Sequence, residues 1–114
     1  MDLDKIKQDI SNFSKERDWD QFHSPKNISM ALSVESSELL EIFQWLTEEE
    51  SYSLNDSKKQ DTKEEVADIA IYLIRMCMKL DIDLEEAIIE KMIKNREKYP
   101  VEKVKGSAKK YTEL

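Results

Sequence analysis

The chain contains a single glycine, Gly106, among 114 residues, and it has no stretch in which β-branched residues alternate with polar ones. Alternation marks half-buried strands and glycine marks tight turns and bulges, so this composition favours helices throughout. The length suffices for one domain whose core needs no disulfide bonds. The sequence therefore predicts one all-α domain.

Helix boundaries are indicated by capping residues and by apolar residues that recur every three or four positions. Ser24 followed by Pro25 is typical of a helix start, and Asp83 begins a capping-box pattern. The chain should form a domain of residues 1–105, followed by a basic, flexible tail of residues 106–114. We expect four helices, over residues 3–16, 25–47, 62–80 and 84–99, with a polar linker at 48–61.

The third expected helix is apolar on nearly every side. Between Val66 and Leu80 its charged residues are Asp68, Arg75 and Lys79. A helix of this kind has to be covered all round, and one small four-helix bundle is too small to do so. We therefore expect a bundle that associates with further copies of the chain, as a homodimer or a homotetramer.

Two pairs of acids lie where an amphipathic helix normally carries apolar residues. Projected at about 100° per residue, Glu35 falls inside the apolar stripe of the second helix and Glu38 lies at its edge. Glu65 and Asp68 have the same spacing and border the inner face of the third helix. The apolar residues that define these faces are Ile28, Leu32, Leu39, Ile42, Phe43 and Leu46, and on the third helix Val66, Ile69, Leu73 and Cys77.

Carboxylates beside a core are costly and repel one another, so they require protons, partner cations or a bound divalent ion. Ligands that are all oxygen suit Mg²⁺ or Mn²⁺ better than Zn²⁺. A di-iron site would need Glu-x-x-His motifs, and the only histidine, His23, is in none. The alternative to a metal site is that these four acids form salt bridges with lysine and arginine side chains at the rim of the core.

Further polar and aromatic residues have two interpretations each. Lys91 and Asn95 continue the inner face of the fourth helix. In one interpretation they contact the phosphate and sugar of a ligand. In the other, Lys91 only packs its apolar stem against the protein surface. Trp19, His23 and Trp45 could enclose a flat base, although aromatic side chains also pack in cores and lids.

Composition limits the class of protein and its partners. The net charge of -7 argues against a nucleic-acid-binding module. The apolar runs are too short to span a membrane, and the charged N-terminal segment lacks the apolar region of a signal peptide. We expect a cytoplasmic protein.

Several segments resemble those of the MazG-like all-α nucleoside triphosphate pyrophosphohydrolases. The resemblance covers the chain from about Glu16 onward, apart from the linker around residues 48–61. The W-x-x-F-H and G-S-A-x-K-Y-T patterns are similar to the branch of that family that acts on dCTP. The matching segments are ERDWDQFHSPKNISMALSVESSELLEIFQW, EEVADIAIYLI, DIDLEEAI, KMIKNREKYP and KGSAKKYTEL.

The resemblance implies a dimeric or tetrameric helical core and Mg²⁺-dependent cleavage of dCTP-like nucleotides between the α- and β-phosphates. The products would be a nucleoside monophosphate and pyrophosphate, and the role would be cleansing of the nucleotide pool. Glu38, or Glu35 in second place, would accept the proton of the attacking water. A non-catalytic helical interaction protein with a structural acid cluster is the alternative. By matching position, the metal ligands would be Glu35, Glu38, Glu65 and Asp68, the base pocket would contain Trp19, His23 and Trp45, and the sugar and phosphate contacts would be Tyr72, Lys91 and Asn95.

Overall fold

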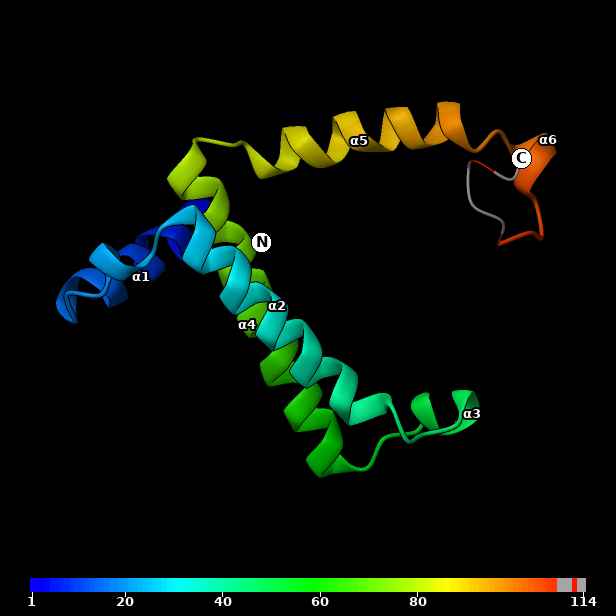
Figure 1. Cartoon of the computed structure of the whole chain (residues 1–114), viewed down its shortest axis with the longest axis horizontal. Helices are drawn as coiled ribbons and strands as arrows, with labels where there is room; N and C mark the ends of the chain where they lie inside the picture. Colours follow the sequence, from blue (N-terminus) through cyan, green and yellow to red (C-terminus); the bar gives the residue numbers. More distant parts are fainter. Residues whose placement is uncertain (109–111, 113–114) are drawn as a thin grey trace. The chain divides into compact units, whose positions relative to one another are not determined.

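The structure, a computed structural model, describes residues 1–108 and 112. These residues form six α-helices and a short 3₁₀-helix without any strand, which confirms the all-α prediction. Two compact units, Met1–Ile82 and Asp83–Leu114, are described separately. The elements are α1 (Leu3–Glu16), η1 (Asp20–Phe22), α2 (Pro25–Phe43), α3 (Glu48–Ser51), α4 (Asp56–Leu80), α5 (Leu84–Lys98) and α6 (Val101–Val104) (Figure 1).

The helix starts follow the capping residues. The Ser24 side chain accepts a hydrogen bond from the backbone N–H of Asn27, with Pro25 in the first turn of α2. Asp83 caps α5 by accepting from the backbone N–H of Glu86. Both starts, and the bounds of the first helix, agree with the prediction.

The linker expected at residues 48–61 is wrong. Thr47 and Glu50 form a capping box that opens α3, and α2 ends at Phe43 rather than near Thr47. Asn55 then caps α4 by accepting from the backbone N–H of Lys58, so α4 begins at Asp56. Its first turns consist largely of polar residues with adequate helix propensity, which carry no apolar period for the sequence to reveal.

The core of the first unit lies between α2 and α4, which run side by side, while α1 packs against α4 (Figure 1). Ile28 is almost fully buried, at 1% exposure, and Ile10, Ile74 and Cys77 are also buried. The apolar stripe expected on α2 is confirmed, because every member is buried or half-buried. This packing fixes the faces on which the acids of both helices lie.

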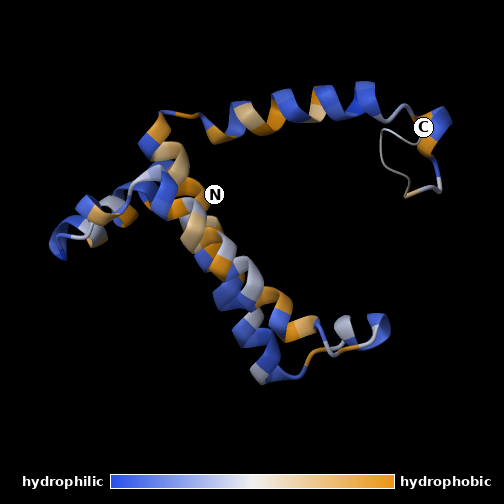
Figure 2. Ribbon diagram, viewed as in Figure 1, coloured by the Kyte–Doolittle hydropathy of each residue, from blue (hydrophilic) through white to orange (hydrophobic). Residues whose placement is uncertain are grey.

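The inner face expected on α4 is only partly right. Cys77 is buried, but Val66 and Leu73 are 52% and 42% exposed within the chain, and Ile74 is buried in their place. Figure 2 shows apolar residues along much of α4 and at intervals along α5. The exposed apolar residues of these two helices are Val66, Ile71, Leu73, Met78, Leu80, Ile88, Ile89, Met92 and Ile93.

The described helices number six rather than four, and α5 belongs to the second unit, so a four-helix bundle stays a prediction. The same holds for a domain of residues 1–105 with a separate tail. Of that tail, residues 109–111, 113 and 114 lie outside the described residues. No helix in the described part of the chain is both long and apolar enough to cross a bilayer.

Candidate active site

Three carboxylates meet where α2 passes α4. Glu35 and Glu38 on α2 and Glu65 on α4 each place one oxygen within 4.8 Å of the others. Glu35 and Glu65 are half-buried and Glu38 is exposed. The Oε2 atoms of Glu35 and Glu65 are buried and have no hydrogen-bond partner among the described residues. The packing of two helices thus brings together acids that are far apart in the sequence.

The charges of this group act on one another. The neighbouring Glu65 carboxyl, burial and Glu38 raise the pKa of Glu35 to about 7. Glu35 lowers the pKa of Glu65. Burial and the charges of Glu38 and Asp68 raise that pKa by more, so the pKa of Glu65 lies above its usual value. Without a cation, the group therefore holds a proton near neutral pH.

Asp68 lies one turn after Glu65 on α4, just outside the group of three. Its charge contributes to the raised pKa of both Glu35 and Glu65. Asp68 also lines the adjacent cavity, whereas the three glutamates do not. It therefore connects the carboxylates to that cavity.

The three clustered glutamates, with Asp68 one turn away on α4, have the chemistry of a divalent-cation site. Their donor atoms are all oxygens, which suits a hard ion such as Mg²⁺ or Mn²⁺. Two of those oxygens are buried without a partner. None of the ion pairs within residues 1–108 involves these acids, so the salt-bridge alternative lacks its partners there.

The adjacent cavity has a volume of about 270 Å³ and lies among α1, η1 and α4. Trp19, His23 and Tyr72, three of the predicted substrate contacts, line it together with Asp68. The remaining lining residues are Asp9, Ile10, Phe13, Ser14, Ile71 and Arg75. None of these six residues was predicted to belong to a site. For Arg75 the sequence did carry a signal, because it is the only arginine in an otherwise largely apolar stretch of helix, residues 66–80.

The end of α1 explains why Trp19 reaches the cavity. Asp18 adopts a left-handed conformation with φ of 53°. The N–H of Trp19 donates to the carbonyl of Ser14 at 2.9 Å, and that of Asp18 donates to Lys15 at 3.1 Å. This is the Schellman pattern of helix ends, with aspartate in the position usually taken by glycine. The turn folds the chain back, and the Trp19 ring meets the Phe13 ring edge-on, with centroids 5.8 Å apart.

His23 follows η1 and is half-buried. Its Nδ1 atom is buried and has no hydrogen-bond partner among the described residues. Burial, followed by the charge of Arg75, lowers the pKa of His23 below its usual value. The imidazole is therefore neutral near pH 7 and has one nitrogen free to donate or accept a hydrogen bond inside the cavity.

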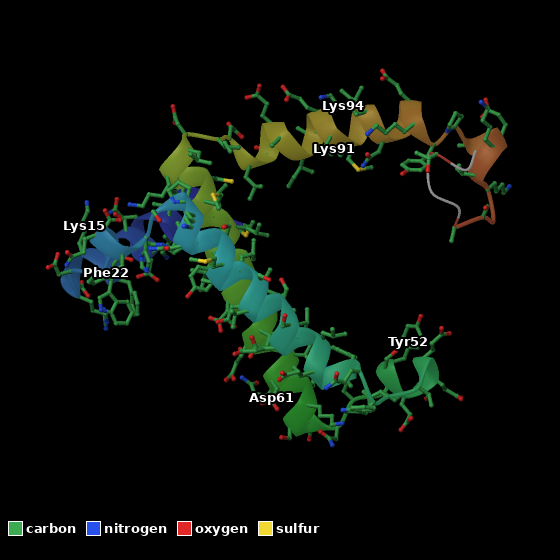
Figure 3. The ribbon with its side chains drawn as sticks, viewed as in Figure 1. Lys15, Phe22, Tyr52, Asp61, Lys91 and Lys94 are labelled. Atoms are coloured by element: carbon green, nitrogen blue, oxygen red, sulfur yellow. The ribbon has the colours of Figure 1, made fainter. Side chains whose placement is uncertain are left out.

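Trp45 is not among the residues that line this cavity. Trp45 follows the C-terminal end of α2 and is 86% exposed. The 19 residues of α2 separate it from His23, a length of roughly 28 Å at 1.5 Å per residue. Lys91, labelled in Figure 3, is exposed on α5, and Asn95 is half-buried there. Both belong to the second unit, so their roles stay predictions.

Comparisons with known proteins match this chain to the MazG-like family and to pyrophosphatases. The family model described as the MazG-like family matches residues 30–114. The dCTP pyrophosphatase 1 of Rattus norvegicus is 40% identical over 98% of this chain and 67% of that protein, and the Bos taurus protein is 41% identical over 98% and 68%. A crystal structure of a pyrophosphatase from Archaeoglobus fulgidus is 37% identical, with a TM-score of 0.82 over 88% of this chain and 94% of that one.

Proposed function

Because the chain belongs to the MazG-like family, we propose that it hydrolyses dCTP-like nucleoside triphosphates between the α- and β-phosphates. The products are a nucleoside monophosphate and pyrophosphate, and the role is cleansing of the nucleotide pool. The pyrophosphatases among its relatives support this class of enzyme. One observation of the chain itself carries the proposal: three carboxylates converge within 4.8 Å beside a cavity walled by aromatic rings, and Asp68 adjoins both.

The acids are proposed to hold Mg²⁺ or Mn²⁺. A divalent cation bound there neutralises charge on phosphate oxygens and lowers the pKa of an attacking water. Glu35, Glu65 and Asp68 supply ligand oxygens from the sides of α2 and α4. Glu38 is the exposed member of the group, so it is the carboxylate that water reaches most readily. We therefore propose that Glu38 is the general base that accepts the proton of the attacking water, with Glu35 as the second candidate.

The cavity is proposed to hold the nucleoside. Trp19 offers a ring face for stacking, His23 an unpaired nitrogen for the base edge, and Tyr72 a contact to the sugar. Lys91 and Asn95 of the second unit are proposed to contact the phosphates. Trp45 lies too far along α2 to line the cavity of its own chain, so its proposed role in a base pocket requires another copy of the chain.

We propose a cytoplasmic homodimer or homotetramer that binds no nucleic acid. The apolar side chains exposed on α4 and α5 support association, since large apolar surfaces of this kind usually mark interfaces. The net charge of -7 opposes binding to a polyanion.

A panel of nucleoside triphosphates, incubated with Mg²⁺ and scored for pyrophosphate, tests the activity. We expect release from dCTP in preference to dTTP, and none after treatment with EDTA. The Asp68→Asn variant controls for contaminating enzymes. If no nucleotide yields pyrophosphate above that of the variant, the chain is instead a non-catalytic helical interaction protein.

A further inference from the structure

We propose that Arg75 determines base specificity in the cavity beside the carboxylates, and that its guanidinium donates hydrogen bonds to the carbonyl oxygen and adjacent ring nitrogen of cytosine. The inference rests on the proposed function, because it takes this cavity as the base pocket. It adds a residue that the sequence did not single out.

Arg75 is buried without a strong partner. The residue is 6% exposed. Its Nη1 lies 3.5 Å from the carbonyl oxygen of Ile10, and its Nη2 lies 3.5 Å from Oδ1 of Asp20. Its Nε has no partner among the described residues. Five N–H donors are thus left with two long contacts, although an unpaired buried charge is costly.

Asp20 does not account for Arg75. The same Oδ1 atom accepts a hydrogen bond of 2.7 Å from Lys79, and the Asp20 side chain is 58% exposed. Lys79 is therefore the main partner of Asp20, and it does not line the cavity. The guanidinium keeps donors available for a ligand.

Two further polar atoms in the cavity lack partners. Ser14 is 1% exposed, and neither its Oγ nor the Nδ1 of His23 has a hydrogen-bond partner among the described residues. The same cavity is walled by the rings of Phe13 and Trp19. Flat apolar walls with unpaired polar atoms between them suit a planar ring that carries hydrogen-bonding groups at its edge.

The chemistry of arginine selects among bases. A guanidinium only donates hydrogen bonds, and its planar fork matches two adjacent acceptors. Cytosine presents such a pair, its O2 and N3 atoms. Thymine and uracil carry a hydrogen on N3, which would face the donors of Arg75. Guanine also offers two acceptors, O6 and N7, so it is the base that the experiment has to exclude.

Calorimetric titration of the full chain with dCMP, dTMP and dGMP, at saturating Mg²⁺, tests the inference. The wild type should bind dCMP about tenfold more tightly than the other two, as one good bidentate contact provides. Arg75→Met should lose about tenfold in affinity for dCMP and leave dTMP nearly unchanged. Arg75→Lys should also lose the preference, because an ammonium lacks the planar fork.

Lys79→Met is the matched control, because it removes the other partner of Asp20 and leaves the cavity wall intact. It should retain the preference for dCMP. The inference is overturned if the wild type has no preference for dCMP, or if Arg75→Met keeps it or weakens all three nucleotides equally. It is also overturned if Lys79→Met loses the preference as Arg75→Met does.

Two measurements keep the outcomes separate. Thermal melts followed by circular dichroism check the folding of each variant, and Arg75→Lys decides the matter if Arg75→Met does not fold. Pyrophosphate release by the wild type is measured in parallel. Its absence would contradict the proposed function, while the binding preference would still be decided by the titrations.

Discussion

The Lys79 ammonium donates a hydrogen bond of 2.7 Å to Oδ1 of Asp20, and this contact joins α4 to the η1 turn, 59 residues away in the sequence. Lys79 also lowers the pKa of Asp20 below its usual value. The turn it holds is flanked by Trp19 and His23, two residues of the cavity wall. The contact therefore fastens the η1 turn to α4, and neither of its two residues lines the cavity.

Replacing Lys79 tests how much this contact stabilises the fold. Because Asp20 is largely exposed, we expect Lys79→Met to lower the Tm by at most about 4 °C, the effect of an ordinary surface ion pair in a domain of this size. Thermal melts at neutral pH measure it. A much larger fall would mean that the η1 turn depends on this one contact.

The carboxylate group is tested by changes that keep shape and remove charge. Glu38→Gln and Asp68→Asn should each reduce kcat by at least about a hundredfold, as losses of metal ligands or of a general base do. Glu41→Gln is the control, because Glu41 is exposed on the same helix and outside the group of three. Steady-state assays at saturating Mg²⁺ that find wild-type turnover in either variant would remove that residue from the site.

Stacking on Trp19 predicts a loss that does not depend on the base. Trp19→Ala should raise KM for every nucleotide by about tenfold, since each base has a face to stack. Tyr52→Ala is the control, because Tyr52 is 90% exposed at the end of α3 (Figure 3) and does not line the cavity. Unchanged KM values in a folded Trp19→Ala protein would return the indole to a packing role.

The sequence predicted those features that depend on local rules. Ser24 and Pro25 mark a helix start by their own chemistry, and the period of the apolar residues places Glu35 among buried neighbours on α2. What it missed depends on packing or on weak local signals. Asn55 caps α4 ahead of a run of polar residues with no apolar period, and Arg75 becomes part of a cavity only when α1 packs against α4.

Association of copies is tested on α5. Ile93 is 52% exposed, and a charge at a buried interface is costly. We expect the wild type to be a dimer or tetramer by light scattering, and Ile93→Glu to shift it toward the monomer. Lys94→Gln, a change of the neighbouring exposed side chain, should leave the mass unchanged. A monomeric wild type at high concentration would contradict the oligomer.

The raised pKa of Glu35 predicts how stability depends on pH when metal is removed. Its folded pKa is about 7, against an ordinary value of 4.5. Between these values the folded protein holds a proton that the unfolded chain has released. The contribution of Glu35 is therefore fully present below pH 4.5 and is lost as the pH rises toward 7. The lowered pKa of His23 acts in the opposite direction, but in the wild type and a Glu35 variant alike.

Paired melts of wild type and Glu35→Gln in EDTA isolate this contribution. At about pH 5 the Tm values of the two proteins should lie within about 2 °C of each other. At about pH 8 the Tm of the variant should be about 5 °C higher than that of the wild type. This difference is modest because Glu35 is only half-buried. Added Mg²⁺ at the higher pH should raise the wild-type Tm more than that of the variant, which has lost a ligand. An acid that instead stabilised the fold through a salt bridge would give the reverse: the variant would melt lower at the higher pH, and Mg²⁺ would not change the order.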